Sequence, residues 1–346
     1  MSLEAAAQRL WYGPRWKSLP LWPLGWLFRA VVGLRVGLYR LGLLQAQHVA
    51  VPVVVVGNVT VGGTGKTPVA AWLARQLALR GHRVGVVLRG YGGRALDPPR
   101  LVTADSDPAD VGDEAVLHAL RRPQAVVVGA DRVAAARRAA EQGAEIIVCD
   151  DGLQHLRLAR DVEIAVVDAT RGLGNRLMLP AGPLREPPGR LERVNAVVFT
   201  QRGEPVTPGM TVRKPLTLTM RLSLGDAVNL RTGERRALDR FRGRTLNAVA
   251  GIGNPGAFFA GLLAAGLRVE PHALADHAAL DPAALPFPGS ATVLMTEKDA
   301  VKCRSFAGAD WWFVELGVSL ERAAAGELLA LVLERAGLSG AGVHIG

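Results

Sequence analysis

Short runs of valine and isoleucine alternate with helical patterns between residues 51 and 200. The candidate strands are residues 53–56, 84–88, 125–128, 146–149, 164–167 and 196–199. Continuous apolar runs of this length are typical of strands that are buried on both faces of a parallel sheet. Candidate crossover helices lie at residues 70–79, 113–120 and 132–142. The alternation predicts an α/β domain with a doubly wound, mostly parallel sheet.

The pattern changes after residue 202. An alternating segment at 211–222 and a polar region at 229–236 predict a β-rich connector over residues 203–244. A second α/β pattern begins at residue 245, continues through 291–296 and 311–316, and ends in a helix at 320–336. We therefore expect four parts, namely an N-terminal segment at 1–47, the main α/β domain at 48–202, the connector, and a smaller C-terminal α/β domain at 245–346.

Residues 18–44 are mainly apolar but carry Arg29, Arg35 and Arg40. A helix of about 22 residues rises roughly 33 Å, enough to cross a bilayer. However, each arginine near the bilayer centre costs about 2.5–3.5 kcal/mol. Interfacial anchors are supplied by Trp11, Trp16, Trp22 and Trp26. The segment predicts a helix that lies in the membrane interface with its arginines toward anionic lipid; an amphipathic helix packed on the core is the alternative.

Composition fits a folded protein, since 49% of the 346 residues are hydrophobic and 21% are charged. Lys plus Arg number 41 against 31 Asp plus Glu, for a net charge of +10. This excess suits nucleic acid, an anionic membrane or a phosphorylated ligand, and composition does not choose among them. Cys149 and Cys303 have no metal-ligand spacing and are too few for a disulfide scaffold, which favours a reduced, cytoplasmic setting.

The apolar run at 53–56 leads into a glycine-rich loop, GNVTVGGTGKT, at residues 57–67. A strand, such a loop and a following helix form a phosphate-binding P-loop, with Pro68 in the first helical turn. The predicted nucleotide contacts are Thr60, Val61, Gly62, Gly63, Thr64, Gly65, Lys66 and Thr67. Lys66 would neutralise the β- and γ-phosphates, and the Thr67 hydroxyl would hold Mg²⁺. The usual spacing has glycine where this chain has Thr60, and a simple glycine-rich turn is the alternative.

Acidic side chains are expected at the same edge of the sheet. Asp150 and Asp151 follow the strand at 146–149, where an aspartate commonly holds Mg²⁺ opposite a P-loop threonine. Asp113 and Glu114 open a predicted helix and supply a candidate general base and a second acidic group near the metal. The alternatives are an ordinary Asp-Asp-Gly turn for the first pair and stabilisation of the helix dipole for the second.

Two further loops carry candidate substrate contacts. Arg89 and Tyr91 follow the strand at 84–88 in a glycine-rich exit. The loop at 168–186 contains Arg171, Arg176 and Arg185 among glycines and prolines, a composition that suits a phosphorylated ligand. A solvated, charged connection is the alternative. The segment TEKDAVK at 296–302 matches the guanine-reading motif of GTPases poorly and indicates no base specificity.

Taken in order, these motifs closely resemble the tetraacyldisaccharide 4′-kinases, the lipid A kinases of Gram-negative bacteria. The resemblance rests on GNVTVGGTGKTP at 57–68, RGYG at 89–92, GDE at 112–114, DDGLQH at 150–155, LPAGPLRE at 179–186 and TEKDAVK at 296–302. It covers nearly the whole chain and accounts for Thr60, because the family's P-loop is non-standard there. It implies ATP-dependent phosphorylation of the 4′-hydroxyl of a tetraacylated glucosamine disaccharide 1-phosphate, giving lipid IVA, at the cytoplasmic face of the inner membrane.

The resemblance also implies roles for individual residues. It places the catalytic aspartate at Asp113 and supports a helping histidine at His277, although the family often has a second histidine where this chain has Ala278. Lys66 joins the catalytic set, Glu114 joins the metal set, and Asn58 joins the substrate contacts. The expected cofactors are ATP and Mg²⁺, and the expected partners are the lipid substrate and an anionic membrane surface, with no nucleic acid.

A membrane-associated P-loop ATPase or GTPase switch is the competing interpretation. Such a switch needs a mobile effector loop that senses the γ-phosphate, and no segment of the sequence is identified as one. A soluble ligase-like P-loop enzyme would leave the tryptophan- and arginine-bearing N-terminus unexplained.

Overall fold

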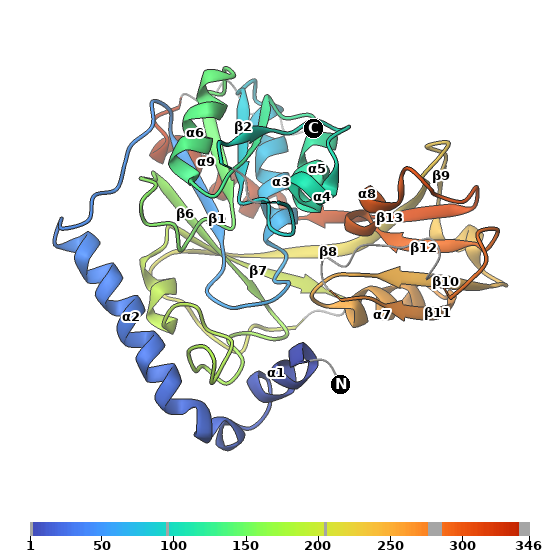
Figure 1. The fold of residues 1–346 in the computed structure, drawn as a ribbon, viewed down its shortest axis with the longest axis horizontal. Coiled ribbons are helices and arrows are strands. Elements are labelled where there is room, and N and C mark those ends of the chain that lie inside the picture. The colour runs from blue at the N-terminus through green and yellow to red at the C-terminus, as the bar shows by residue number, and fades with distance from the viewer. Residues whose placement is uncertain (1–2, 95–96, 204–205, 276–285, 339–346) are drawn as a thin grey trace.

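The structure is a computed structural model that describes residues 3–94, 97–203, 206–275 and 286–338. Its helices are α1 (Leu3–Trp11), α2 (Trp22–Arg40), α3 (Lys66–Ala78), α4 (Pro108–Val111), α5 (Asp113–Leu120), α6 (Arg132–Glu141), α7 (Pro255–Ala264), α8 (Glu297–Cys303) and α9 (Arg322–Arg335). Short 3₁₀ helices lie at η1 (Arg15–Leu21), η2 (Pro188–Arg193) and η3 (Leu238–Phe241). Figure 1 shows these helices around one extended sheet, with α1 and α2 along its periphery.

The strands of the described residues form one 13-stranded sheet in the order β11-β10-β12-β13-β8-β7-β6-β1-β5-β2-β4-β3, with β9 paired to β8. They are β1 (Val53–Gly57), β2 (Val84–Leu88), β3 (Arg100–Leu101), β4 (Ala125–Val128), β5 (Ile146–Asp150), β6 (Val162–Asp168), β7 (Ala196–Arg202), β8 (Leu216–Asn229), β9 (Arg235–Arg236), β10 (Thr245–Ala250), β11 (Arg268–Ala273), β12 (Val293–Thr296) and β13 (Trp311–Ser319). All six strands predicted between residues 51 and 200 are confirmed, as is the mostly parallel α/β fold.

The long strand β8 joins the two halves of the sheet. Residues 216–222 pair in parallel with β7, and residues 221–229 pair antiparallel with β13. The region between residues 203 and 244 therefore contains a strand that belongs to both halves of the sheet. The domain boundaries themselves stay a prediction.

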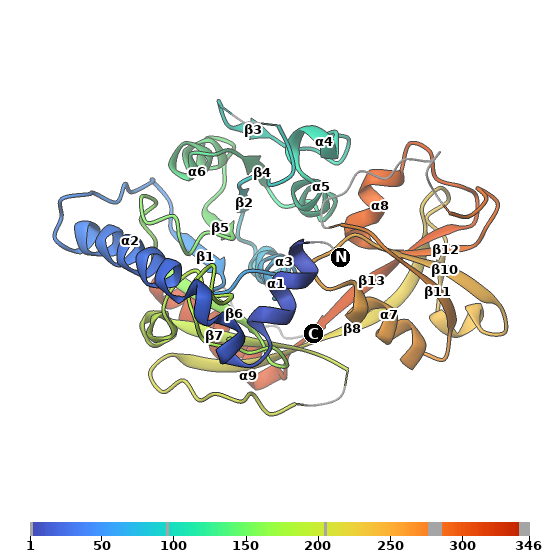
Figure 2. The same ribbon diagram turned by 60° about the horizontal axis from the view of Figure 1, so that its bottom comes forward.

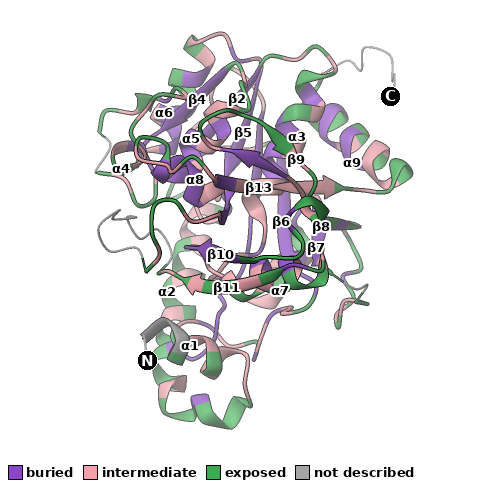
Figure 3. Cartoon of the chain, turned by 90° about the vertical axis from the view of Figure 1, so that its right-hand side faces the viewer, coloured by how far each residue is buried: buried purple, intermediate pink, exposed green. Residues whose placement is uncertain are grey.

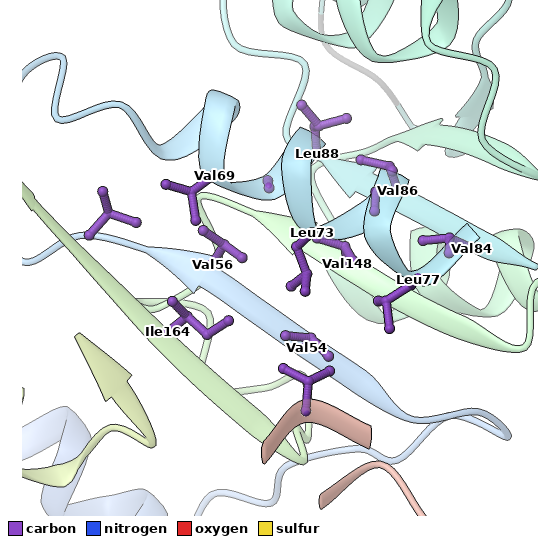
Figure 4. Close-up of a cluster of buried hydrophobic side chains, with 14 of the residues drawn as sticks. Val54, Val56, Val69, Leu73, Leu77, Val84, Val86, Leu88, Val148 and Ile164 are labelled. Carbon is purple, nitrogen blue, oxygen red and sulfur yellow. The ribbon is translucent and has the colours of Figure 1, made fainter. Parts of the chain in front are cut away.

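Helix α3 and the strands around it enclose the main core. Val54 and Val56 on β1 pack with Leu73 and Leu77 on α3, all fully buried (Figure 4). Strand β1 lies between β5 and β6 and is covered on both faces, which is why its valines run without alternation. The C-terminal helix α9 returns to this same core, because Leu328 and Val332 belong to it as well.

Helix α2 differs from every core helix in its exposure. Of its 19 residues only Gly25 is buried, and the apolar side chains Trp26, Leu27 and Leu34 are 65%, 62% and 66% exposed. Figure 3 shows the same predominance of exposed and intermediate residues around α1 and α2. By length and composition the stretch Arg15–Arg40, with a mean hydropathy of 1.3, is apolar enough to cross a membrane.

We expect Leu73→Ala to lower the free energy of unfolding by about 2–5 kcal/mol, because it leaves a cavity in a close-packed core. Leu79→Ala at the end of the same helix is the matched control, since Leu79 is 67% exposed. It should change stability by less than about 0.5 kcal/mol. Urea denaturation of both variants measures this difference, and equal midpoints would contradict the assigned core.

Candidate active site

The P-loop connects β1 to α3 and is shaped by glycines in the left-handed region. Gly62 and Gly65 have φ of 107° and 84°, and Gly65 precedes the first residue of α3. A Cβ at Gly65 would lie 3.0 Å from Leu222 Cδ1 and 3.2 Å from Thr200 Cγ2. The loop therefore needs glycine there both for its backbone conformation and for its contact with the neighbouring strands. It ends at the N-terminus of a helix, the usual position of a bound phosphate.

Hydrogen bonds brace the loop from several sides. Asn58 Nδ2 donates to Thr64 Oγ1 at 3.0 Å, and Thr200 Oγ1 donates to the Thr64 carbonyl at 2.7 Å. The Val61 amide donates to the Pro183 carbonyl at 2.8 Å. Asn58, expected among the substrate contacts, is fully buried and supports the loop from within. Thr60 is also buried and pairs with Leu184.

Asp151 meets the P-loop lysine at the carboxyl edge of the sheet. Lys66 Nζ lies 3.7 Å from Asp151 Oδ1, and Arg185 Nη1 donates to the same oxygen at 3.1 Å. Burial alone would raise the pKa of Asp151, but Lys66 and Arg185 hold it below its ordinary value. Asp151 is therefore ionised and forms part of the charged floor of the site.

Asp150 ends β5 and is almost fully buried. Its Oδ2 lies 3.1 Å from His118 Nε2, whereas Oδ1 is buried and has no hydrogen-bond partner among the described residues. A buried carboxylate oxygen without a partner suits a cation. The described residues contain no cluster of three or more His, Cys, Asp or Glu that could hold a metal. Mg²⁺ usually takes one or two carboxylates together with phosphate oxygens and water, so Asp150 fits as one ligand.

Helix α5 carries Asp113 and Glu114 at its first turn, and α8 approaches them from the other half of the sheet. Lys302 Nζ lies 3.6 Å from Asp113 Oδ2, and Lys298 Nζ lies 4.0 Å from it. Lys298 Nζ also lies 3.6 Å from Glu114 Oε1. The two lysines were not predicted from the sequence. The sequence signal that could have identified them is their spacing of four residues, which places both lysines on one face of a helix.

Burial and the surrounding charges shift the pKa of Glu114. Burial raises the pKa of this carboxyl above its ordinary value, and Asp150 and Asp113 add to the rise, against the opposing effect of Lys298 and Lys66. The four carboxylates and their cations therefore form one electrostatic cluster around the end of the P-loop.

A pocket of about 540 Å³ extends from this cluster to helix α2. Its apolar wall on α2 consists of Phe28, Val31, Val32 and Val36. Its polar wall includes Arg89, Tyr91, Glu114, Arg132, Asp150, Asp151, Gln154, His155, Arg185 and Glu186. Three predicted substrate contacts, Arg89, Tyr91 and Arg185, thus come together. Arg171 lies elsewhere, with its guanidinium 5.3 Å from the centre of the Tyr12 ring.

Arg132 is a pocket residue that the sequence pattern did not single out, because it stands at the start of an ordinary crossover helix. Its Nη1 donates to the Gly129 carbonyl, while Nε and Nη2 are buried without a nitrogen or oxygen partner among the described residues. The positive charges of Arg132 and Arg89 also affect the pKa of His155. Burial, assisted by these two cations, lowers the pKa of His155 to about 4. The pocket therefore combines a neutral imidazole with several guanidinium groups and favours an anionic ligand.

His277, the predicted partner of Asp113, lies outside the described residues, as does its neighbour Asp276. Its role stays a prediction.

Comparisons with known proteins agree on one family. Residues 17–334 match the sequence profile described as Tetraacyldisaccharide-1-P 4'-kinase. Among curated proteins, the tetraacyldisaccharide 4'-kinase of Pseudomonas paraeruginosa is 46% identical over 317 residues, which cover 91% of this chain and 93% of that protein. The protein of the same name from Nitrosococcus oceani is 44% identical over 332 residues, covering 95% and 94%. The crystal structure of LpxK from Aquifex aeolicus in complex with ATP superimposes with a TM-score of 0.78 at 28% identity, covering 92% of this chain and 99% of that one.

We expect the His155 ring to titrate with a midpoint near pH 4, and Arg132→Gln to raise that midpoint by removing a neighbouring cation. Arg335→Gln on α9 is the control and should leave it unchanged. Because the unfolded chain binds this proton near pH 6.5, the contribution of His155 to folding stability should fall as the pH drops from about 6.5 to 4. Histidine-selective NMR measures the midpoint, and a wild-type value near 6.5 would contradict the buried, cation-flanked setting.

Proposed function

This chain belongs to the tetraacyldisaccharide-1-P 4'-kinase family, and we propose that it transfers the γ-phosphoryl group of ATP at the sheet edge between the P-loop and helix α2. The enzyme is a kinase of lipid A biosynthesis that phosphorylates the 4′-hydroxyl of a tetraacylated glucosamine disaccharide 1-phosphate. The roles of its individual residues, its metal and its membrane contact are proposed below from the contacts of the site.

Lys66 and the loop at 60–67 bind the phosphates of ATP. The observation that carries this role is the 3.7 Å contact of Lys66 with Asp151, which holds the lysine at the N-terminus of α3. Phosphoryl transfer depends mainly on positioning and on neutralising charge on the phosphoryl oxygens. A lysine held by a carboxylate is well suited to that task.

Asp150 is the best-suited metal ligand among the four acidic residues, because its Oδ1 is buried and unpartnered among the described residues. Thr67, Asp151 and Glu114 are the further candidates. When bound, Mg²⁺ would neutralise the β- and γ-phosphate oxygens of ATP. Asp151 is committed to Lys66 and Arg185, so a contact through water suits it better than direct coordination.

Asp113 acts as the general base for the acceptor hydroxyl. It opens α5 at the same sheet edge and is 4% exposed, a position that keeps its carboxylate oriented. Its Oδ1 accepts a hydrogen bond from the Glu114 amide at 2.8 Å, and Lys298 and Lys302 approach Oδ2. These contacts fix the carboxylate and require a rearrangement near Oδ2 when the hydroxyl is bound. We also propose that His277, which lies outside the described residues, assists Asp113.

The acceptor lipid occupies the pocket between the carboxylates and α2. Arg132, whose Nε and Nη2 are buried without a nitrogen or oxygen partner among the described residues, and Arg185 supply contacts for the phosphate that the acceptor already carries. Phe28, Val32 and Val36 supply an apolar wall for acyl chains. Val31 lines the pocket and is also 57% exposed, so the apolar surface continues from the pocket to the outside of α2.

The outward surface of α2 lies on the membrane. Leu24, Leu27, Val31 and Leu34 are exposed and recur at spacings of three and four residues, which puts them on one side of the helix. Soluble proteins seldom expose a continuous apolar surface of this kind to solvent. Trp16 and Trp26 are exposed as well. We place the enzyme at the cytoplasmic face of the bacterial inner membrane, with this stripe toward the lipid and with Arg35 in the lining of the pocket.

We expect Asp113→Asn to lower kcat by about 100-fold or more, because an amide keeps the shape of the side chain but cannot accept the proton. The affinity for ATP and the melting temperature should change little. Steady-state kinetics with ATP, Mg²⁺ and a tetraacyl disaccharide 1-phosphate in detergent measure this effect, with Asp110→Asn on α4 as the control.

A second variant, Lys302→Met, tests whether Asp113 acts as the general base or only holds helix α8 in place through its ion pair with Lys302. If Asp113 served only to hold α8, removal of Lys302 would cost as much activity as Asp113→Asn and would lower the melting temperature. Full activity of Asp113→Asn would exclude it as the base and direct attention to Asp150 or Asp151.

We expect Leu27→Ser with Leu34→Ser to weaken binding to vesicles of anionic phospholipid by at least about tenfold, since each leucine contributes about 1.5–3 kcal/mol when buried. Both side chains are exposed, so the melting temperature should not fall. Leu79→Ser, which removes an exposed leucine at the end of α3, is the control. Vesicle co-sedimentation measures the change. Unchanged binding of the double variant would place the membrane contact on another surface.

A further inference from the structure

His118 is a buried histidine that none of the proposed roles uses. It lies on α5, is 1% exposed, and its Nε2 is 3.1 Å from Asp150 Oδ2. A histidine ring nitrogen that carries a proton donates to such a carboxylate oxygen, and this is the arrangement on which the inference is built. The pair is the contact between α5 and the carboxyl end of β5 at the level of the acidic cluster.

The contact leaves Asp150 with one oxygen used and one free. Oδ2 is occupied by His118, whereas Oδ1 is buried and has no hydrogen-bond partner among the described residues. A carboxylate held through one oxygen cannot rotate freely, so its other oxygen keeps a fixed direction. An unpartnered buried acceptor costs stability unless a ligand satisfies it, which points to a bound cation as the partner of Oδ1.

Glu114 lies one turn before His118 on the same helix. Glu114 and His118 are four residues apart in α5, and residues at this spacing lie on the same face of a helix. Because His118 is attached to Asp150, the first turn of α5 is held at a defined distance from the end of β5. Two carboxylates from distant parts of the sequence are thereby kept in register.

We propose that His118 is a positioning residue that orients Asp150, through the Nε2–Oδ2 hydrogen bond, for Mg²⁺ bound with ATP. The inference rests on the proposed metal role of Asp150. Outer-shell partners of this kind typically change metal affinity by about 10–100-fold when they are removed.

The test compares ATP binding with saturating Mg²⁺ and with EDTA, measured by calorimetry on the full-length chain in detergent. Glutamine and methionine form a matched pair at position 118, because both are unbranched and of similar size but only glutamine can donate to Asp150. We expect His118→Met to reduce the gain in affinity produced by Mg²⁺ by about tenfold or more. We expect His118→Gln to stay within about threefold of the wild type. Neither variant should change the affinity in EDTA.

Asp150→Asn provides the reference. It should abolish most of the gain in ATP affinity produced by Mg²⁺, called the Mg²⁺ effect below. If the two residues act together, the double variant with His118→Met should show the same remaining gain as Asp150→Asn alone. If Asp150→Asn keeps the full Mg²⁺ effect, the proposed metal role itself is wrong. If Asp150→Asn loses the effect but His118→Met retains it, the inference about His118 is overturned and the pair only stabilises the fold.

Should His118→Met fail to fold, His118→Asn replaces it, since its shorter amide stops short of Asp150 while keeping a polar group in the buried position. Loss of the Mg²⁺ effect in His118→Asn with recovery in His118→Gln would support the inference. Equal behaviour of the two amides would overturn it.

Discussion

Charge balance at the carboxyl edge of the sheet is the constraint on which the rest of the site depends. Strands β1 and β5 are parallel, so Asp150 and the P-loop lie at the same edge of the sheet. A carboxylate that is buried there destabilises the fold unless a cation or a hydrogen-bond donor compensates its charge. Lys66 and Arg185 neutralise Asp151, and lysines of α8 neutralise the carboxylates of α5. These cations come from α3, from the loop that carries Arg185 and from α8, so the cluster forms only when both halves of the sheet are assembled.

The single sheet explains how α8 reaches α5. Strand β8 pairs with β7 over its first half and with β13 over its second, so the second half of the sheet is attached by continuous hydrogen bonding. Figure 2 shows α8 on the side of that half that faces α5. Arg121 on α5 and Glu297 on α8 add an ion pair at 2.9 Å. Val301 of α8 also belongs to the same buried apolar cluster as Ala115 and Val116 of α5, so apolar packing and ion pairs both hold the two halves of the sheet together at this point.

In the function that we propose, helix α2 links the chemistry to the bilayer. One side forms the apolar wall of the pocket through Phe28 and Val32, and an adjoining side turns Leu27 and Leu34 outward. The proposed acceptor lipid would reach the carboxylates along this continuous apolar surface while its chains stay in the membrane. The arrangement also accounts for arginines in an otherwise apolar segment, since Arg35 lines the pocket and Arg29 lies 5.7 Å from the Trp26 ring centre at the exterior.

The sequence by itself determined the features that depend on local pattern. Apolar runs identified the buried strands, glycines before Lys66 identified the phosphate loop, and the position of Asp150 directly after a strand placed it at the sheet edge. Only the tertiary structure decided that His118 meets Asp150, that Lys302 meets Asp113, and that α9 joins the core of β1. The reason is physical. Helix and strand periodicity encode which residues are buried, but contacts between elements far apart in the chain depend on strand order, which no local pattern specifies.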